Sequence, residues 1–337
     1  MKKTTIKDIA TKLGVSASTI SRALSDHPDI SDDLKIKIKE TARLMKYRPS
    51  TAALNLKRGT NKTIALILPE VTSFFYPSVI HGIENVLHAQ GFTLLILTTD
   101  DSLEREIENI DIAYDHDVAG VLLALSKETS NLEHLSILNE SSIPVLLIDK
   151  VIEGSEYSSI TIDDYRVSYQ MVQHLYKSGC RNIIGVFGKA SLTISHQRFK
   201  GFSQALSDLG LENSESHVQF VNNSEEARQK TLALLKSTFP DGLYLMTDEI
   251  MLGAMPAIAE MNIKVPDQLG VIAISDGLLP HFMIPKISHM KHDGHELGSL
   301  SAQKIIQYIN ARNNNLMWRN VENVVMNTMI VLLESTK

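Results

Sequence analysis

Cysteine and long apolar runs are nearly absent from this sequence. Cys180 is the single cysteine among 337 residues, so the chain can form no internal disulfide, and a reducing compartment suits it. No stretch approaches the roughly 18 consecutive apolar residues of a membrane span. The first lysines are followed by neither the apolar segment nor the cleavage site of a secretory signal. These absences predict a cytoplasmic protein with no membrane partner.

The motifs of several enzyme classes are also missing. The sequence has no G-x-G-x-x-G fingerprint of a dinucleotide site and no credible nucleophile–base set. Residues 187–191, FGKAS, have only part of the spacing of a phosphate-binding loop, so we reject that interpretation. His289, His292 and His295 recur every three residues, but solvated or hydrogen-bonded histidines explain this better than a metal site. We therefore expect no enzyme, no metal and no cofactor.

Charge is distributed unevenly along the chain. Residues 1–60 hold 13 Lys and Arg against 6 Asp and Glu, a net charge of +7. The remainder holds 33 − 13 = 20 basic and 39 − 6 = 33 acidic residues, a net charge of −13. Because 337 residues exceed one ordinary domain, we expect a separate basic head on an acidic body. The head is the part suited to the phosphates of a nucleic acid.

Residues 1–46 have the pattern of three short helices. Thr5 begins a Thr-x-x-Asp capping signature, and apolar residues then recur at helical spacing as far as Leu13. Gly14 suits the left-handed turn that ends a helix, Ser16 can cap a second helix, and Ser31 precedes a third. Three helices with a tight glycine turn between the first two predict a helix-turn-helix, whose second helix reads DNA.

The second helix and its cap supply the candidate DNA contacts of the head. Small hydroxyl side chains can reach phosphates, and Arg22 can form a bidentate contact with a guanine edge. A phosphate contact or a solvated side chain is the alternative for Arg22, and helix capping is the alternative for the hydroxyls. The predicted DNA-binding residues are Thr5, Ser16, Ala17, Ser18, Thr19, Ser21 and Arg22.

Several segments carry a family resemblance that extends along the chain. They read TIKDIATKLGVSASTISRAL, YRPSTAALNLKRGTNKTIALILP, HGIENVLHAQGF, VAGVLLAL, IPVLLID, QRFKGFSQAL and ELGSLSAQKI. In this order they resemble the LacI/GalR family of bacterial transcription regulators over essentially the whole chain. The resemblance implies an α/β fold with an N-terminal all-α helix-turn-helix head. Behind the head it implies a two-lobed, periplasmic-binding-protein-like body of two Rossmann-like parallel sheets.

Residues 47–61 link the head to the body and resemble the family's hinge helix. A helix this short is unstable in isolation, so we expect it to form only under some conditions. The resemblance implies that it forms on DNA and pairs with its twin in the minor groove, with Leu56 wedged into the central base step. A core leucine is the alternative. The predicted contacts here are Ser50, Ala53 and Leu56, and the pairing implies a homodimer on a pseudo-palindromic operator.

From residue 62 onward, apolar runs alternate with helical patterns, which predicts parallel sheets. The runs lie at 64–68, 94–97, 118–125, 145–148, 183–187, 242–246 and 271–274. The resemblance implies two lobes joined by three chain crossings, which we place near Ser159, His289 and Glu322. The body, residues 62–337, then has an N-lobe of about 62–159 and 291–321. Its C-lobe is about 160–290 and 322–337.

Ligands of parallel sheets bind beyond the carboxyl ends of the strands. Aromatic and polar residues follow the predicted strands, which is the composition of a small-molecule pocket. Arg198 matches the arginine of the family's R-x-x-G-F motif, which typically reaches the effector; a structural ion pair is the alternative. The predicted effector-binding residues are Phe74, Phe75, Tyr76, Asp100, Ser126, Asp149, Arg198, Thr247, Asp248, Ser275 and Asp276.

Three departures from the family pattern bear on the effector. Sugar-responsive members usually have Asn-Asp at Thr247-Asp248 and Asp-Asp at Ser275-Asp276, and often an arginine at Leu332. These changes remove hydrogen-bond partners of a hydroxyl-rich ligand. We expect a carbohydrate-type effector, with a modified or acidic sugar, or a compound other than a sugar, as alternatives.

The resemblance implies a sequence-specific DNA-binding regulator, expected to be a repressor, that is controlled by a small molecule and associated with the nucleoid when bound to DNA. A solute-binding transport component would share the body fold, but the basic head argues against it.

Overall fold

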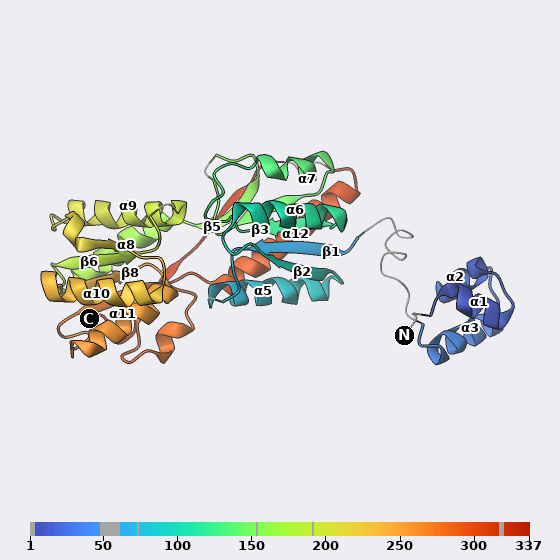
Figure 1. Ribbon diagram of the computed structural model, residues 1–337, viewed down its shortest axis with the longest axis horizontal. Helices are drawn as coiled ribbons and strands as arrows, with labels where there is room; N and C mark the ends of the chain where they lie inside the picture. Colours follow the sequence, from blue (N-terminus) through green and yellow to red (C-terminus); the bar gives the residue numbers. More distant parts are fainter. Residues whose placement is uncertain (1–3, 48–60, 73, 153, 191, 317–319) are drawn as a thin grey trace. The chain divides into compact units, whose positions relative to one another are not determined.

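The computed structural model describes residues 4–47, 61–72, 74–152, 154–190, 192–316 and 320–337. The chain divides into two compact units, Met1–Asn61 and Lys62–Lys337, which are the head and the body (Figure 1). The predicted hinge contacts Ser50, Ala53 and Leu56 lie outside the described residues. Among the described residues, no helix combines the length and the apolar character that a membrane crossing requires.

The head contains the three expected helices. They are α1 (Ile6–Leu13), α2 (Ala17–Leu24) and α3 (Asp32–Leu44). Thr5 and Asp8 form a reciprocal capping box at the start of α1, and Gly14 ends that helix with a left-handed backbone, φ 67°. Ile9, Ile20 and Ile38, one from each helix, are fully buried and form the centre of a small apolar core.

The N-lobe of the body is a six-stranded parallel sheet with the order β11-β5-β4-β3-β1-β2. Its strands are β1 (Thr63–Leu68), β2 (Thr93–Thr98), β3 (Gly120–Leu123), β4 (Val145–Ile148), β5 (Ser158–Ile162) and β11 (Asn323–Met326). Its helices are α5 (Phe75–Ala89), α6 (Leu103–Asp115), α7 (Ser136–Glu140) and α12 (Gly294–Asn313), with a 3-10 turn at Glu133–Leu135.

The C-lobe has a second six-stranded sheet, with the order β12-β10-β9-β8-β6-β7, in which only β12 is antiparallel to its neighbour. Its strands are β6 (Ile183–Phe187), β7 (Val218–Phe220), β8 (Gly242–Leu245), β9 (Gly270–Ser275), β10 (Ser288–Lys291) and β12 (Met329–Val331). Its helices are α8 (Asp164–Lys177), α9 (Thr193–Asp208), α10 (Ser224–Thr238) and α11 (Asp248–Glu260), with 3-10 turns at Glu215–His217 and Leu279–Phe282.

The three crossings between the lobes fall later than the sequence predicted. The first follows β5, because Ser159 pairs with Asn323 inside the N-lobe sheet. The second follows β10, because His289 pairs with Ala273 inside the C-lobe sheet. The third lies between β11 and β12, beyond Glu322, so the predicted lobe limits at residues 159 and 321 were wrong. Hydrogen bonding to a strand distant in sequence decides sheet membership, and a short apolar run does not reveal it.

Helices α5 and α12 pack with unusually close backbones, and this packing fixes one wall of the site. A Cβ added at Gly298 would lie 2.1 Å from the carbonyl oxygen of Val79, and one at Gly82 would lie 2.1 Å from that of His295. Only glycine permits this approach. It holds Phe75, at the start of α5, close to the segment that enters α12.

Candidate ligand-binding site and DNA-binding surface

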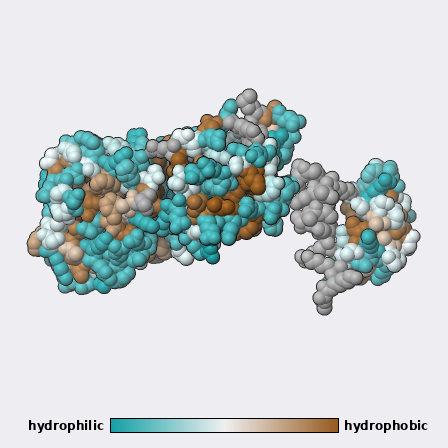
Figure 2. All heavy atoms as spheres, turned by 45° about the horizontal axis from the view of Figure 1, so that its top comes forward, coloured by the Kyte–Doolittle hydropathy of each residue, from teal (hydrophilic) through white to brown (hydrophobic). Residues whose placement is uncertain are grey.

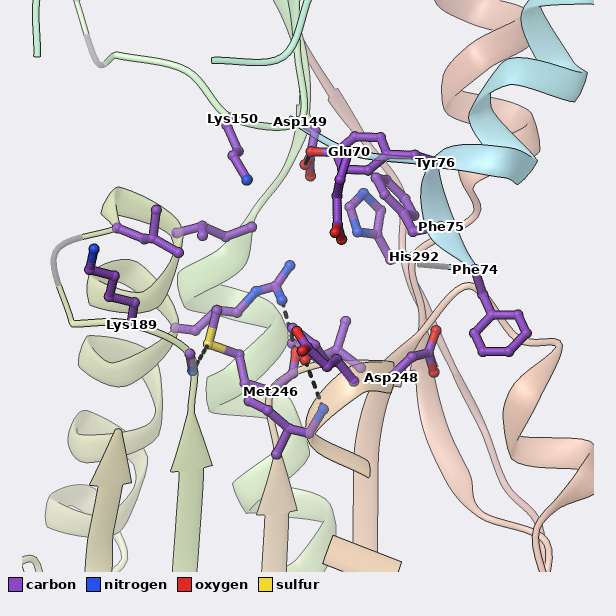
Figure 3. Close-up of a pocket in the computed structure, with 18 of the residues that line it drawn as sticks. Glu70, Phe74, Phe75, Tyr76, Asp149, Lys150, Lys189, Met246, Asp248 and His292 are labelled. Carbon is purple, nitrogen blue, oxygen red and sulfur yellow. Dashed lines mark hydrogen bonds between the residues drawn. The ribbon is translucent and has the colours of Figure 1, made fainter. Parts of the chain in front are cut away.

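A cavity of about 420 Å³ lies between the two lobes of the body (Figure 3). Residues that follow the strands of both sheets line it, because the two sheets direct their carboxyl ends toward each other across the cavity. Nine of the eleven predicted effector-binding residues line it: Phe74, Phe75, Tyr76, Asp149, Arg198, Thr247, Asp248, Ser275 and Asp276. The volume is within the range of about 300–1,000 Å³ that is typical of small-molecule pockets.

Two predicted residues lie elsewhere. Asp100 is exposed and forms an ion pair with Arg105, whereas its neighbour Asp101 lines the cavity. Both aspartates have a left-handed backbone, φ 49° and 59°, so this turn after β2 sends adjacent side chains in different directions. Ser126 is buried, and its hydroxyl donates to Thr99 Oγ1 at 2.8 Å. It lines a second, adjoining cavity of about 260 Å³.

Arg198 is a buried cation on α9 that lines the cavity. Its Nε donates to Asp164 Oδ1 at 2.7 Å, and its Nη1 donates to the carbonyl oxygen of Met246 at 2.9 Å. Burial raises the pKa of Asp164 to about 6, against the opposing effect of the guanidinium. Arg198 therefore forms a structural ion pair and also lines the cavity.

An aromatic wall closes one side of the cavity. The rings of Phe75 and His292 lie 4.3 Å apart, centroid to centroid, and Tyr76 donates its hydroxyl hydrogen to Asp149 Oδ2 at 2.9 Å. Burial lowers the pKa of His292 to about 4, so its imidazole is neutral near pH 7. His292 Nε2 is buried and has no hydrogen-bond partner among the described residues.

The carboxylates of Asp248 and Asp276 line the cavity next to the aromatic wall. Asp248, the first residue of α11, accepts a weak hydrogen bond through Oδ2 from the backbone N–H of Asp276, at 3.4 Å. Burial raises the pKa of Asp248 to about 6, and its Oδ1 has no partner among the described residues. Asp276 Oδ1 accepts from the backbone N–H of Gly294 at 2.7 Å. A buried polar atom without a partner costs about 1–3 kcal/mol, so Asp248 Oδ1 and His292 Nε2 mark positions that a ligand can satisfy.

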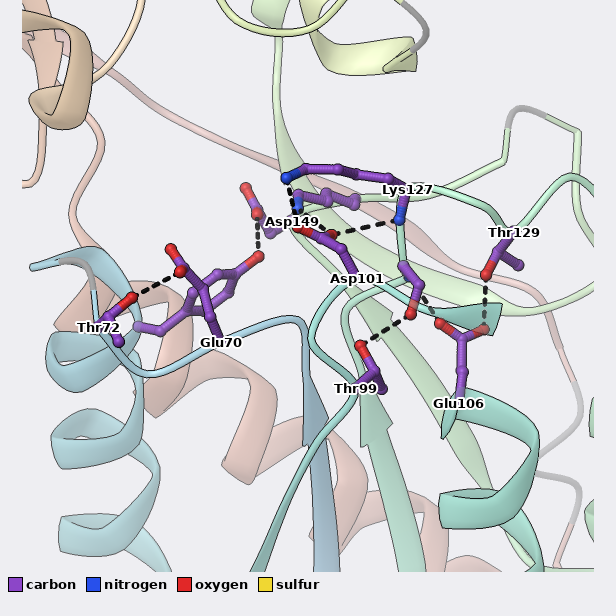
Figure 4. A network of polar contacts seen from close by, with 11 residues as sticks. Glu70, Thr72, Thr99, Asp101, Glu106, Lys127, Thr129 and Asp149 are labelled. Atoms are coloured by element: carbon purple, nitrogen blue, oxygen red, sulfur yellow. Dashed lines mark hydrogen bonds and ion pairs between the residues drawn. The ribbon is translucent and has the colours of Figure 1, made fainter. Parts of the chain in front are cut away.

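Three lysines that sequence reasoning did not select also line the cavity. Lys127 pairs with Asp101 at 2.5 Å (Figure 4). Lys150 pairs with the same carboxylate at 3.5 Å, and Lys189 follows β6. The loop that carries Lys127 is held by buried Glu106, which accepts from the backbone N–H of Ser126 at 2.6 Å. A lysine after a strand is usually solvated, so no local signal distinguishes these residues. Only the order of the strands brings them together.

The head presents its candidate DNA contacts on α2. Ala17, Ser18 and Arg22 are exposed. Ser16 Oγ accepts from the backbone N–H of Thr19 at 3.1 Å, so it caps α2. The Thr5 side chain likewise belongs to the capping box of α1. Capping, the alternative that the sequence left open for these hydroxyls, therefore occurs at both positions.

A helix-turn-helix head joined to a two-lobed body with a cavity between the lobes defines a class of protein that couples DNA binding to ligand binding. Residues 61–321 match the family model "Periplasmic binding proteins and sugar binding domain of LacI family". Residues 5–50 match the model "Bacterial regulatory proteins, lacI family". The chain therefore belongs to the LacI family of DNA-binding transcriptional regulators.

Individual proteins are similar to it over nearly their full length. The transcriptional regulator RegA of Clostridium saccharobutylicum is 27% identical over 92% of this chain and 93% of its own. The catabolite control protein A of Priestia megaterium is 25% identical over 91% and 92%. The solved lac repressor dimer bound to operator and the anti-inducer ONPF superposes with a TM-score of 0.85 and 19% identity, covering 99% of both chains. That likeness shows the fold.

Proposed function

We propose that this protein is a cytoplasmic transcriptional repressor that binds a pseudo-palindromic operator as a homodimer. A small molecule in the cavity between the lobes changes its affinity for the operator. The observation that carries the proposal is the combination, in one chain, of an exposed reading helix and a cavity with buried, unpartnered polar atoms. The chain's relatives are regulators, which supports a binding function without a chemical reaction.

The head supplies sequence discrimination through α2. In a helix-turn-helix this helix lies in the major groove, and its outward side chains contact base edges and phosphates. Arg22 is exposed near the end of α2 and can donate two hydrogen bonds to one guanine. Ser18 and Ser21 carry hydroxyls suited to phosphate contacts. The hinge contacts at Ser50, Ala53 and Leu56 stay predictions from the sequence.

The body supplies control because the cavity has walls from both lobes. Tyr76 and Asp149 belong to the N-lobe side, and Asp248 belongs to the C-lobe side. A ligand that contacts both sides binds one arrangement of the lobes better than the other. This unequal affinity is the thermodynamic requirement for a ligand to shift the equilibrium between two conformations.

Exposed apolar side chains on the body mark the surface that we assign to the second subunit. Figure 2 shows apolar areas within an otherwise mostly hydrophilic surface of the body. The exposed large apolar residues include Ile96, Ile107, Ile112 and Tyr114 in the N-lobe and Leu252, Leu278, Phe282 and Ile284 in the C-lobe. Ile96 lies on β2, an edge strand whose unpaired backbone groups need a partner or a cover. Apolar areas of this kind mark protein–protein contacts.

The test is selection of bound duplexes from a random DNA pool at fixed salt, with and without a mixture of metabolites. We expect a palindromic motif whose recovery changes when the metabolites are present. A motif that ignores every metabolite would contradict the control by a ligand. Recovery of no motif by a folded dimer would overturn the assignment of α2 as the reading helix.

A further inference from the structure

We propose that the effector is an anionic polyhydroxy compound, and that its phosphate or carboxylate binds at the start of α9. This inference rests on the proposed function, because it takes the cavity between the lobes as the effector site. The anion cradle, as we name it, consists of the N-terminus of α9 together with Gly188, Lys189 and Ser195. Gly188 and Lys189 belong to residues 187–191, the segment that has only part of the spacing of a phosphate-binding loop.

The first component of the anion cradle is the N-terminus of α9. This helix has 16 residues, no capping hydrogen bond from the side chain of Leu192, and no acidic residue in its first turn. Leu192 and Ile194 line the cavity, so the helix begins at the cavity wall. The first backbone N–H groups of a helix have no acceptor within the helix, and together with the helix dipole they attract an anion.

Two further donors at the same place lack a good acceptor. Ser195 is fully buried, and its Oγ has no hydrogen-bond partner among the described residues. That hydroxyl faces Gly188, since a Cβ added to Gly188 would lie 3.4 Å from it. The backbone N–H of Gly188 donates to Met246 Sδ at 3.1 Å, and a thioether is a weak acceptor (Figure 3). An anionic oxygen would satisfy both donors better than the protein does.

Positive charge gathers on the same side of the cavity. Lys189 follows Gly188 directly, is exposed and has no ion-pair partner among the described residues. Lys127 and Lys150 both pair with Asp101, and Lys127 also interacts electrostatically with Glu249. Both also line the adjoining cavity together with Leu192 and Ile194, so they lie near the start of α9.

The opposite side of the cavity offers acceptors and an aromatic surface. Figure 3 places Lys150 and Lys189 on one side, and Phe75, Tyr76 and His292 on the other. Asp248 Oδ1 and His292 Nε2, both buried and unpartnered, can accept hydrogen bonds from hydroxyl groups. A ligand with an anionic end and a hydroxyl-bearing end satisfies both sides at once. Neither a fully neutral sugar nor a bare anion does so.

The first test uses the full-length protein and inorganic phosphate as the probe, against chloride at equal ionic strength. We expect phosphate to raise the melting temperature of the body in a saturable manner. Ser195→Ala should raise the half-saturating phosphate concentration by about tenfold, the loss of one charge-assisted hydrogen bond. Lys189→Gln should raise it by about threefold, because an exposed charge is partly screened.

Lys200→Gln is the matched control, since it removes the same charge from an exposed position within α9, away from the start of that helix. It should leave the phosphate response unchanged. The head also binds phosphate if it binds DNA, so the informative quantity is the difference between wild type and the variants of the anion cradle. An identical response of wild type, Ser195→Ala and Lys189→Gln would overturn the proposal. Ser195→Ala removes an unsatisfied hydroxyl and should not destabilise the fold, which keeps the comparison interpretable.

The second test separates this proposal from the function on which it rests. The metabolite mixture that alters operator binding is passed over an anion exchanger at neutral pH, and both fractions are assayed again for operator binding. We expect the activity in the retained fraction. Activity in the flow-through would overturn the anionic effector and leave the regulator intact, whereas no activity in either fraction would count against control by a ligand. Phosphatase treatment then distinguishes a phosphate, whose activity is lost, from a carboxylate, whose activity persists.

Discussion

In the three-helix part of the head, the candidate DNA contacts lie in one continuous stretch between Thr5 and Arg22. In the body, the cavity takes its walls from segments between Glu70 and His292. The head residues are positioned by capping bonds and helical periodicity, interactions that span three or four residues. The body residues are positioned by the order of strands in two sheets. The comparison shows that a site within one helix depends on local interactions, whereas a site between lobes depends on the whole fold.

The largest effect expected in the body follows from removing the buried cation. Arg198→Ala leaves Asp164 buried without its partner, and breaking a buried pair in this way costs about 3–5 kcal/mol. The urea midpoint of the body should fall, while the head should unfold as in wild type. The exposed pair of Arg228 with Glu225 supplies the control, since Arg228→Ala should change the midpoint little. Equal midpoints for the two variants would show that Arg198 has no structural role.

The corresponding change in the head is Ile20→Ala. Ile20 is fully buried, and this truncation costs about 2–5 kcal/mol, which a core of three short helices cannot absorb. We expect loss of DNA binding with the unfolding of the body unchanged, measured by operator titration and by urea unfolding. Ile36→Ala, at an exposed position of α3, is the control. If Ile20→Ala also destabilised the body, the head and body would not be independent units.

A pH dependence is expected from His292. Its pKa is lowered by burial to about 4, so the unfolded chain binds the proton more readily than the folded chain. The contribution of this group to stability is therefore present above about pH 6.5 and is lost as the pH falls toward 4. His292→Gln should remove this loss, a difference of about 2 kcal/mol near pH 5, with urea unfolding as the measurement.

Asp248 in the cavity changes the stability with pH in the opposite direction to His292. Burial raises the pKa of Asp248 to about 6, so its contribution falls as the pH rises from about 4 to 6. The His292→Gln comparison must therefore be made against wild type at each pH. His295→Gln, at an exposed position three residues further on, is the control. A wild-type profile parallel to that of His292→Gln would refute the role assigned to the buried imidazole.

The smallest effect on stability, and the sharpest on function, is expected at Arg22. Arg22→Ala removes an exposed side chain, so the head should remain folded while discrimination at one base pair falls by about 1–3 kcal/mol. Binding assays on the selected operator and on its single-base variants measure this discrimination. Arg43→Ala removes an exposed arginine from α3 and should weaken all of these sequences alike, if it weakens any. A uniform loss for Arg22→Ala would make that residue a phosphate contact.

The sequence allowed the three helices of the head, most strands of the body and nine lining residues of the cavity to be predicted. The lining residues were found because they directly follow apolar strands, which is a local signal. Asp100 was predicted to line the cavity, but its neighbour Asp101 does so instead. The cause is the left-handed backbone of both residues in the turn after β2, which the sequence does not reveal. Ser126 follows its strand as expected, but a buried network with Thr99 and Glu106 holds it away from the cavity.

The sequence by itself determined the family resemblance, the three helices of the head and the strand-by-strand pattern of the body, because capping bonds and periodic burial act over a few residues. Only the tertiary structure decided that Lys127 and Lys150 share Asp101, and that His292 packs on Phe75 without a partner for its Nε2. It also decided which strands belong to which lobe. These outcomes depend on hydrogen bonds and contacts between residues far apart in the chain, and no short pattern records which distant partner a strand or a side chain will meet.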